Sequence, residues 1–440
     1  MKVLKFGGTS VGSPQRMKEV SALINDGKQK IVVLSAMSGT TNSLVEIASY
    51  LKKNNREAAN VCINRLRHIY KEHVGNLHAK PEFAERTMQF LLGTFDNLLT
   101  MVSREYTPEL EKEILAQGEL MSTNMVIAYL QEQGIKATLI PALDYMMIDE
   151  NGEPDLHYIK EHLKDILKKQ PGYEIYLTQG FITRNRKGEI DNLQRGGSDY
   201  TACLIGAAVG AEEIQIWTDI DGMHNNDPRI VEHTTPVRQL NFEEAAELAY
   251  FGAKILHPTC IQPARYAGVP VRLLNTMDPE APGTLINNEM RRGTIKAVAA
   301  KDNITAIKIV SSRMLLATGF LRKVFEIFET YNTSIDMVTT SEVGVSLSID
   351  NKSRIVPILE ELKKYGAVEV DEDMCIVCVV GDLTGERVGV ASEIIEAFKE
   401  SPVRMISYGG SEHNISFLIS KDDKKAALCA LSRQLFGEKE

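Results

Sequence analysis

The chain lacks the features of membrane-bound, secreted and nucleic-acid-binding proteins. No apolar run approaches the ~20 residues needed to cross a bilayer, and the opening residues lack the long apolar segment and small-residue cleavage site of a signal peptide. No dense block of Lys and Arg occurs, and 50 basic against 59 acidic residues give a net charge of −9. We therefore expect a cytoplasmic protein with neither a membrane nor a nucleic-acid partner.

Cysteine is scarce and scattered. Six cysteines in 440 residues form no disulfide framework, which favours a reducing compartment. Cys375 and Cys378 have the spacing of a zinc knuckle, but they fall in the strand-like run Met374 to Val380 and have no second pair. Because residues three apart on a strand face opposite sides, we interpret both as strand residues and predict no metal site.

The nucleotide-binding signatures of P-loop and Rossmann proteins are also missing. The glycine-rich stretch from Lys5 to Gly12 contains neither Gly-Lys-Ser/Thr nor Gly-x-Gly-x-x-Gly. It lies between an apolar opening and a helical pattern from Pro14 to Leu23, with Ser13 as the predicted N-cap. Its glycines allow close approach of backbone to a ligand, and the cation of Lys5 suits a polyphosphate. Taken alone, a tight turn with a solvated lysine explains the stretch equally well.

Strand-like and helical patterns alternate over most of the first 290 residues. This alternation predicts an α/β fold with a largely parallel sheet and helices on both faces. Residues 43–133 read as mostly helical, with a polar interruption near His73 to Pro81. Helices are also predicted from Leu156 to Lys168 and from Ala202 to Gly210. Ligands of such sheets gather at the carboxyl ends of strands, where the turn after Ile31 to Leu34 joins the glycine-rich stretch.

Several charged residues accompany glycines elsewhere in the chain. Glu119 follows a glycine inside a helical pattern, although the sequence alone slightly favours an exposed helix glutamate. Ser198 and Asp199 precede a helix, where either side chain is a plausible cap. A cap does not explain Arg195, which can bind a carboxylate or phosphate with both arms of its guanidinium. Lys254 lies in a further small-residue turn.

Five motifs resemble those of aspartate kinases in the same order. They are Lys5-Phe-Gly-Gly-Thr-Ser, Arg195-Gly-Gly-Ser-Asp, Thr218-Asp-Ile-Asp-Gly, Asp227-Pro-Arg and Phe251-Gly-Ala-Lys-Ile-Leu-His-Pro. The resemblance covers almost the whole chain. It implies an amino-acid-kinase, carbamate-kinase-like three-layer αβα sandwich over residues 1–290. The implied reaction is phosphorylation of the side-chain carboxylate of L-aspartate by ATP with Mg²⁺, the first step toward lysine, threonine and methionine. No permanently bound cofactor is implied.

The resemblance also assigns residues to roles. It gives catalytic roles to Lys5, Asp199 and Lys254. L-aspartate is expected to contact Ser35, Thr41, Glu119, Phe181, Arg195 and Ser198. ATP is expected to contact Lys5, Gly7, Gly8, Thr9, Ser10, Thr218, Asp219, Asp227, Arg229 and Lys254. The chain departs from the family pattern at Gln194, where a glycine is common, and at His224, where an aromatic residue is common, so His224 is not placed among the ATP ligands.

The last third of the chain contains an internal repeat. Residues 319–350 align without gaps on residues 389–420, and each copy reads as glycine turn, helix, strand, turn, strand, helix. The repeat resembles paired ACT domains, which implies a regulatory domain over 291–440. It would contain two ferredoxin-like βαββαβ units, at about 300–370 and 371–440. ACT pairs assemble side by side, so a homodimer through this region is expected, and a tetramer remains open.

The first ACT unit resembles that of lysine-sensitive aspartate kinases. The residues expected to contact the effector are Met314, Gly319, Phe320, Leu321, Ser334, Ile335, Asp336, Thr340, Ser341 and Glu342. Asp336 or Glu342 would supply an anion for ammonium groups. Ala317 stands where a serine is common in such relatives, and threonine is the second choice of effector after L-lysine.

Three other functions stay open at this point. One is a kinase of the same fold that acts on glutamate, acetylglutamate or a nucleotide, although Thr41, Glu119 and the repeat argue against it. A catalytically silent amino-acid sensor would keep the fold, but Lys5, Asp199 and Lys254 argue for activity. A bifunctional enzyme with a homoserine dehydrogenase is disfavoured, because the chain stops after the second repeat and has no Gly-x-Gly-x-x-Gly. We therefore expect a monofunctional enzyme.

Overall fold

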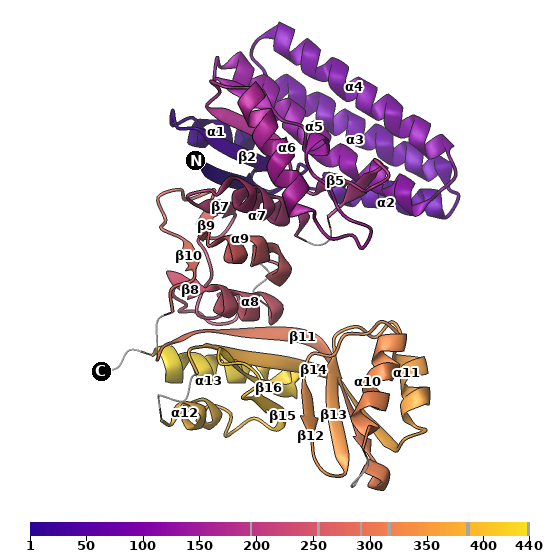
Figure 1. Cartoon of the computed structure of the whole chain (residues 1–440), viewed down its shortest axis with the longest axis vertical. Helices are drawn as coiled ribbons and strands as arrows, with labels where there is room; N and C mark the ends of the chain where they lie inside the picture. The colour runs from indigo at the N-terminus through magenta and orange to yellow at the C-terminus, as the bar shows by residue number, and fades with distance from the viewer. Residues whose placement is uncertain (194–195, 253–255, 291–292, 315–317, 384–387, 438–440) are drawn as a thin grey trace. The chain divides into compact units, whose positions relative to one another are not determined.

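A computed structural model describes residues 1–193, 196–252, 256–290, 293–314, 318–383 and 388–437 (Figure 1). The predictions for Gln194, Arg195, Lys254 and Ala317 lie outside these residues. The chain forms two compact units. Unit 1 comprises Met1–Met223 and Ile255–Asn288, and unit 2 comprises His224–Lys254 and Glu289–Glu440. The segment 224–254 thus groups with the last third of the chain, whereas the proposed domain division lies at residue 290.

Unit 1 is built on a mostly parallel sheet. Its strands run in the order β3-β4-β2-β1-β7-β9-β10, and only β10 is antiparallel to its neighbour in this series. The bounds are β1 Lys2–Phe6, β2 Lys30–Leu34, β3 Ala137–Leu139, β4 Ile175–Gln179, β7 Ile214–Thr218, β9 Val271–Asn275 and β10 Thr284–Asn287. A separate hairpin pairs β5 (Ile182–Arg184) with β6 (Ile190–Asn192). The predicted parallel sheet is confirmed.

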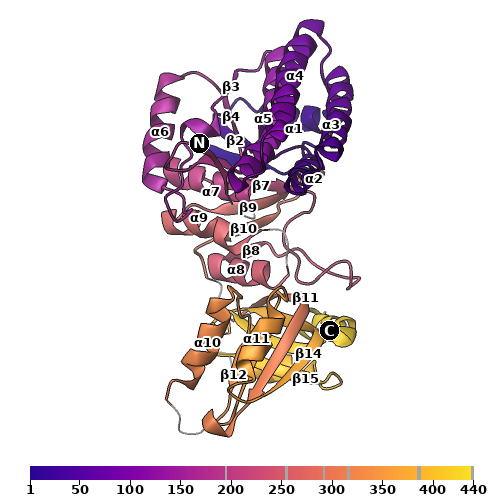
Figure 2. The ribbon, with the colours of Figure 1, turned by 90° about the vertical axis from the view of Figure 1, so that its right-hand side faces the viewer.

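Helices cover both faces of this sheet, as the three-layer prediction requires. Helices α1 and α3 to α5 lie on one face, and α6, α7 and α9 lie on the other (Figures 1 and 2). The bounds are α1 Pro14–Ile24, α2 Thr40–Lys52, α3 Arg56–Leu77, α4 Pro81–Ser103, α5 Pro108–Glu132, α6 Leu156–Lys169, α7 Gly197–Val209 and α9 Gln262–Ala267. The Ser13 side chain accepts a hydrogen bond from the backbone N–H of Arg16, so the predicted N-cap is confirmed.

Two helix boundaries differ from the sequence prediction. Helix α3 continues to Leu77, so the polar interruption is confined to the short connection before Pro81. Helix α7 begins at Gly197, five residues before the predicted start at Ala202. Its N-cap is Gly196, whose φ of 74° is left-handed and therefore suits glycine. Ser198 and Asp199, which were predicted to lie at or near the N-cap, therefore lie inside the first helical turn.

Unit 2 contains an antiparallel sheet in the order β12-β13-β11-β14-β16-β15. Its strands are β11 Ile295–Val310, β12 Val338–Thr340, β13 Gly344–Ile349, β14 Ala367–Gly381, β15 Val403–Tyr408 and β16 Asn414–Ser420. Its helices are α8 Phe242–Tyr250, α10 Phe320–Thr330, α11 Ile355–Leu362, α12 Val390–Glu396 and α13 Lys424–Phe436, and the short strand β8 (Gln239–Asn241) precedes α8. The order of elements in each copy of the repeat is confirmed.

The two copies share the long strands β11 and β14. The first half of β11 pairs with the second half of β14, and the remaining halves pair with each other, with register shifts between Lys301 and Ala306. Val298 packs in one apolar core with Phe417, whereas Ile307 packs in another with Phe328. The first half of β11 therefore belongs to the core of the second copy of the repeat, although it precedes the first copy in sequence.

The two closely spaced cysteines are strand residues, as predicted. Cys375 and Cys378 both lie buried in β14. Across the described residues, no group of three or more His, Cys, Asp or Glu side chains is arranged to hold a metal ion. None of the helices in the described ranges is long and apolar enough to cross a membrane.

Candidate active site

The polar turns of unit 1 meet at the carboxyl edge of its parallel strands. The N–H of Gly7, directly after β1, donates to the carbonyl of Trp217 in β7. The N–H of Ser35, directly after β2, donates to the carbonyl of Phe6. Since neighbouring parallel strands end side by side, the glycine-rich stretch, the turn after β2 and the end of β7 form one surface.

An ion pair stands at the centre of this edge. The Nζ atom of Lys5 lies 2.7 Å from Oδ1 of Asp199, and both side chains are almost completely buried. Lys5 belongs to β1, and Asp199 lies in the first turn of α7. No side chain caps α7, so the capping role considered for Ser198 and Asp199 is wrong. The carboxylate instead fixes the position of a buried ammonium group next to the glycine turn.

The glycine turn packs directly against the turn after β2. A Cβ atom on Gly8 would lie 2.9 Å from the carbonyl oxygen of Ala36, and one on Gly12 would lie 3.1 Å from Cβ of Ser38. The N–H of Ser38 donates to the carbonyl of Gly8 at 3.1 Å. The glycines are therefore needed because two backbone segments touch at this point.

Two hydroxyl groups form a hydrogen bond between the end of the glycine turn and the residue directly after β9. Oγ of Ser10 and Oγ1 of Thr276 lie 2.7 Å apart, and both side chains are buried. The N–H of Thr276 donates to the carbonyl of Thr218 at the end of β7. Thr276 is not among the site residues predicted from the sequence. Its position directly after the strand-like run 271–275 was the signal that could have found it.

Glu119 is buried beside this edge and does not lie on an exposed helix face. It lies in α5 with only 4% of its surface exposed, and its Oε1 accepts a hydrogen bond from the N–H of Ala36 at 3.1 Å. Its Oε2 is buried and has no hydrogen-bond partner among the described residues. Burial raises the pKa of Glu119 to about 7, against the opposing effects of the Ala36 N–H and the Lys5 ammonium. A carboxyl group with a spare buried oxygen suits a cationic group of a ligand.

Gly118 explains how Glu119 reaches this position. A Cβ atom on Gly118 would lie 2.8 Å from Cβ of Ala36, so a larger residue would push α5 away from the turn after β2. We expect Gly118→Ala to lower the free energy of unfolding by about 1–3 kcal/mol through overpacking. Urea unfolding measures this change.

Gly93 provides a matched control for that substitution. It also lies inside a helix, α4, but nothing lies within 4 Å of a Cβ atom at this position. Gly93→Ala should therefore stabilise the protein by up to about 1 kcal/mol, because alanine has the higher helix propensity. Equal effects of the two alanine substitutions would show that the close approach at Gly118 does not determine stability.

Phe181 and Ser198 meet where β4 ends and α7 begins. A Cβ atom on Gly180 would lie 2.5 Å from Cβ of Ser198, and one on Gly197 would lie 2.6 Å from the ring of Phe181. Phe181 itself has a φ of 67°, which is strained for a residue with a side chain. Its N–H donates to Oγ1 of Thr201 at 3.0 Å. This contact holds the strained residue against the helix.

The remaining predicted substrate residues differ in exposure. Ser35 is half-buried directly after β2, and its carbonyl accepts a hydrogen bond from Oγ of Ser122 at 2.8 Å. Thr41 is exposed in the first turn of α2. Thr9 is exposed in the glycine turn. Their roles as ligand contacts stay predictions.

The predicted nucleotide residues do not all fall in one unit. Thr218 ends β7 and Asp219 follows it on the surface, both in unit 1. Asp227 and Arg229 belong to unit 2 and pair with each other, with Nη2 of Arg229 2.7 Å from Oδ2 of Asp227. The Arg229 guanidinium holds the pKa of Asp227 below its usual range. In unit 2, His224 contacts Thr234 at 2.8 Å.

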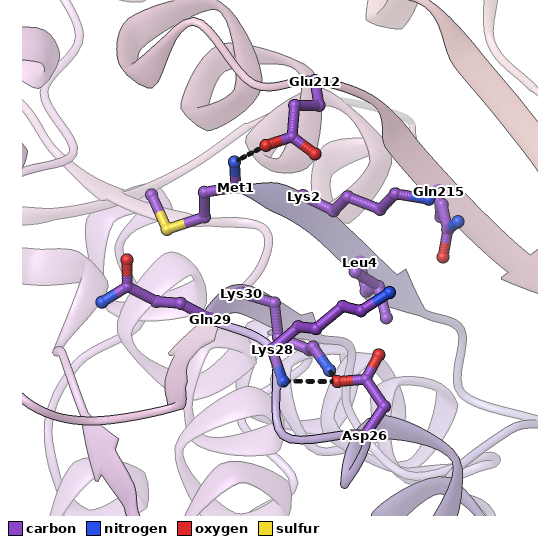
Figure 3. A pocket seen from close by; sticks show the side chains of 9 residues that line it. All are labelled: Met1, Lys2, Leu4, Asp26, Lys28, Gln29, Lys30, Glu212 and Gln215. Carbon is purple, nitrogen blue, oxygen red and sulfur yellow. Dashed lines mark hydrogen bonds and ion pairs between the residues drawn. The ribbon is translucent and has the colours of Figure 1, made fainter.

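A pocket of about 470 Å³ lies at the opposite, amino end of the strands (Figure 3). The residues that line it are Met1, Lys2, Leu4, Asp26, Lys28, Gln29, Lys30, Glu212 and Gln215. Its charges are largely paired, since the terminal amino group binds Glu212 and Lys30 binds Asp26. The glycine turn and Glu119 do not line this pocket, so it is distinct from the candidate active site.

The predicted effector residues belong to unit 2 and lie in sequence from just before α10 to just after β12. Gly319 is the left-handed N-cap of α10, with a φ of 84°. Phe320 is buried, whereas Leu321 and Ser334 are exposed, and Met314 and Ile335 are half-buried. Thr340 ends β12, and Ser341 and Glu342 lie in the turn before β13, in which the N–H of Ser341 donates to the carbonyl of Gly344. Glu342 is exposed, whereas the Asp336 side chain is buried and has partners of its own.

Comparisons with known proteins agree with this architecture. The model of the amino acid kinase family matches residues 1–275, and a model of the ACT domain matches residues 377–435. The chain is 33% identical to lysine-sensitive aspartokinase 3 of Escherichia coli, over 99% of both sequences. The crystal structure of E. coli aspartokinase III with aspartate and ADP aligns with a TM-score of 0.83 at 33% identity, covering 99% of this chain and 100% of that one. The structure of the same E. coli enzyme with lysine and aspartate aligns with a TM-score of 0.81 at 32% identity, covering 99% of each. The chain therefore belongs to the amino acid kinase family and, within it, to the aspartokinases.

Proposed function

We propose that the protein transfers the γ-phosphoryl group of MgATP to the side-chain carboxylate of L-aspartate and releases ADP and 4-phospho-L-aspartate. The observation that carries this proposal is the buried Lys5–Asp199 pair beside the glycine turn, with the spare oxygen of Glu119 nearby. One group suits a transferring phosphate and the other suits an ammonium group.

The proposed chemistry requires alignment and positive charge, and it does not require a general base. The attacking carboxylate of aspartate is already ionised at neutral pH, so no proton has to be removed from it. The Lys5 ammonium stabilises the charge on the γ-phosphoryl oxygens, and Asp199 holds that ammonium in place. The Gly7 to Ser10 turn brings backbone close to the phosphates, and Lys254 and Thr218 are proposed contacts on the nucleotide side.

The substrate is held by complementary charges. Glu119 in its ionised form accepts the α-ammonium group of L-aspartate at the oxygen that has no partner. Arg195 is proposed to bind the α-carboxylate, with Ser35, Thr41, Phe181 and Ser198 around the side chain. A substrate lacking the ammonium group would leave the buried Glu119 oxygen unpaired, which is the basis of selection for an amino acid.

The test of the proposed function is ADP release from MgATP with L-aspartate, L-glutamate or no acceptor. Each acceptor is assayed with and without L-lysine and L-threonine. Turnover that depends on L-aspartate supports the proposal. Turnover with L-glutamate alone would make the protein another kinase of the same fold. No acceptor-dependent turnover by the folded protein would favour the silent amino-acid sensor.

The Ser10–Thr276 hydroxyl pair leads to a prediction about nucleotide binding. Thr276→Val keeps the shape of the side chain but removes its hydroxyl, so Ser10 loses its partner. We expect KM for MgATP to rise about 3- to 10-fold, since one neutral hydrogen bond contributes about 0.5–1.5 kcal/mol. KM for L-aspartate should change less than twofold. Thr276→Ser keeps the hydroxyl and serves as the control, and equal KM values in Val and Ser variants would contradict the role of the pair.

We also propose that L-lysine, with L-threonine as the alternative, inhibits the enzyme at the first ACT unit. The E. coli relative is described as lysine-sensitive, and its structure has been determined with lysine bound. In this chain Ser334, Ser341 and Glu342 are exposed before and after β12. The added amino acids in the assay above decide between the two effectors.

The proposed assembly is a homodimer through the ACT units in the cytoplasm, with a tetramer as the alternative. Both edge strands of the six-stranded sheet carry exposed apolar side chains, Val338 in β12 and Ile406 and Tyr408 in β15. Such edges are covered in many proteins by a second chain. Sedimentation equilibrium measures the mass, and a monomer at micromolar concentration would contradict this assembly.

A further inference from the structure

A buried pair of hydroxyl groups lies at the start of α2, the helix that carries the predicted substrate residue Thr41. Oγ1 of Thr40 and the hydroxyl oxygen of Tyr70 in α3 lie 2.9 Å apart. Both side chains are buried, and the Tyr70 ring belongs to the large apolar core of unit 1. Buried hydroxyl groups require a partner inside the protein, and here each hydroxyl satisfies the other.

Helix α2 depends on this pair because it begins without a side-chain cap. Its N-cap is Gly39, which has a φ of 81° and no side chain to offer to the first backbone N–H groups. Thr40 is the first helical residue, and a Cβ atom on Gly118 in α5 would lie 3.5 Å from its methyl group. Thr40 is therefore held between α3 and α5. The exposed Thr41 follows in the same helical turn, so the contacts of Thr40 fix its position.

The ring of Tyr70 is itself fixed by the next helix. It packs edge to face against Phe95 in α4, with ring centres 5.8 Å apart, and Phe95 is buried as well. A ring held in this way presents its hydroxyl oxygen at one place, because only rotation about the C–O bond remains free. Helices α3 and α4 thus provide a rigid support for the start of α2.

The hydroxyl pair also lies close to the carboxylate that is proposed to bind the substrate ammonium group. Gly118, which approaches the methyl group of Thr40, directly precedes Glu119. Burial and, to a smaller extent, the Glu119 carboxylate raise the pKa of Tyr70, against the opposing effect of the hydrogen bond with Thr40. A displacement of Thr40 would therefore change the distance between Glu119 and Thr41, which are two of the predicted contacts of L-aspartate.

We propose that Tyr70 is a positioning residue for L-aspartate, which acts through Thr40 to fix Thr41 relative to Glu119. The inference rests on the proposed function, because the roles of Thr41 and Glu119 come from it. Tyr70 is buried too deeply to contact the substrate. Its hydroxyl holds the first turn of α2 in one position before the substrate arrives, so binding requires no ordering of this turn.

Tyr70→Phe removes the hydroxyl, keeps the ring against Phe95 and leaves the Thr40 hydroxyl buried without its partner. We expect KM for L-aspartate to rise about 3- to 10-fold, the size of effect that the loss of one neutral hydrogen bond gives. The values of kcat and of KM for MgATP should change less than twofold, because the affected contacts hold the acceptor equally in the ground state and the transition state. Steady-state ADP release at varied concentrations of both substrates measures all three quantities.

Tyr145 provides a matched control for that substitution. Its hydroxyl lies 2.7 Å from Oγ1 of Thr178, and both side chains are completely buried. This pair joins the segment after β3 to β4. Tyr145→Phe therefore removes the same kind of bond and should lower the free energy of unfolding by a similar amount. It should leave KM for L-aspartate within twofold of wild type, which separates positioning of the substrate from a general loss of stability.

A double variant tests whether Tyr70 acts through Thr40. Thr40→Val keeps the shape of the side chain but removes its hydroxyl, so the bond to Tyr70 is already lost. Thr40→Val alone should raise KM for L-aspartate about as much as Tyr70→Phe does. Adding Tyr70→Phe to Thr40→Val should then change KM for L-aspartate by less than twofold, because one bond cannot be removed twice.

The outcomes separate this inference from the proposed function. If wild type is active with L-aspartate but Tyr70→Phe has the same KM, only the role of Tyr70 is overturned. The same holds if Tyr145→Phe raises KM equally, or if Tyr70→Phe has its full effect in the Thr40→Val background. Turnover with L-glutamate alone would overturn the proposed substrate, and KM for L-glutamate in the same variants would decide the role of Tyr70. For an inactive protein, calorimetry gives the Kd for L-aspartate of each variant, and a protein that binds neither amino acid overturns both proposals.

Discussion

Replacing Lys5 with methionine should lower kcat about 10²- to 10³-fold, which is the usual loss when one preorganised charge-stabilising group is removed from an active site. Methionine fills a similar volume but has no charge for the transferring phosphoryl group. The loss should appear mainly in kcat, because the charge on the phosphoryl oxygens is redistributed in the transition state. Steady-state ADP release with saturating MgATP and L-aspartate measures it.

The same substitution leaves Asp199 buried without its cation. We therefore expect Lys5→Met to lower the free energy of unfolding by about 3 kcal/mol, and the double variant Lys5→Met/Asp199→Asn to recover part of that loss without recovering kcat. Lys2→Met is the control, since Lys2 lies in the same strand with its side chain 47% exposed at the opposite end. A kcat for Lys5→Met within tenfold of wild type would remove Lys5 from the catalytic residues.

The elements around the active site were predictable because their signals are local. Pro14 after Ser13 indicates a helix start, and the alternation of apolar runs with helical patterns indicates a parallel sheet. Such a sheet brings the turns after β1, β2 and β7 to one edge, whatever the details of packing. The meeting of the glycine turn with Ser35 and Thr218 therefore followed from topology alone.

Contacts between distant segments were not predictable in the same way. Ser10 and Thr276 are 266 positions apart, and nothing in either neighbourhood identifies the other. The burial of Glu119 depends on the close approach of Gly118 to Ala36, which appears only when α5 is placed on the sheet. Helix α7 begins earlier than predicted because Gly196 occupies its N-cap position. Gly196 has a left-handed backbone conformation, which glycine adopts without strain.

The two halves of the repeat show a further limit of sequence analysis. The order of elements within each copy could be predicted because both copies repeat the same pattern. The pairing of the first half of β11 with the second half of β14 could not be predicted. The pairing of residues 295–301 with the second copy is set by a register shift near Asn303, whose φ is positive. Dividing the sequence into consecutive segments assigns residues 295–301 to the first copy, whereas they pack in the core of the second.

Replacing Glu119 with glutamine should raise KM for L-aspartate about 10- to 100-fold, since a hydrogen bond to a charged group contributes about 1.5–3 kcal/mol. Glutamine keeps the shape and one carbonyl oxygen but loses the negative charge that the substrate ammonium group requires. KM for MgATP should change little. Asp219→Asn is the comparison, because this exposed acid follows β7 on the proposed nucleotide side and should leave KM for L-aspartate unchanged.

The raised pKa of Glu119 gives this prediction a pH dependence with a definite sign. With a pKa of about 7 in the folded protein, Glu119 is largely protonated at pH 6 and ionised at pH 8. KM for L-aspartate of the wild type should therefore fall as pH rises from 6 to 8, and that of Glu119→Gln should stay flat over the same range. A wild-type KM independent of pH would show that Glu119 does not bind the ammonium group in its ionised form.

Stability should respond to pH in the opposite sense. The ordinary pKa of this carboxyl is 4.5, so between pH 4.5 and about 7 the folded protein keeps a proton that the unfolded chain has released. The stabilising contribution of the protonated carboxyl is fully present below pH 4.5 and is lost as pH rises through about 7. Glutamine has no proton to lose, so the stability of Glu119→Gln relative to wild type should increase from pH 5 to pH 8. If substrate affinity rises with pH while the free energy of unfolding falls, the ionised Glu119 carboxylate both binds the substrate and destabilises the folded protein.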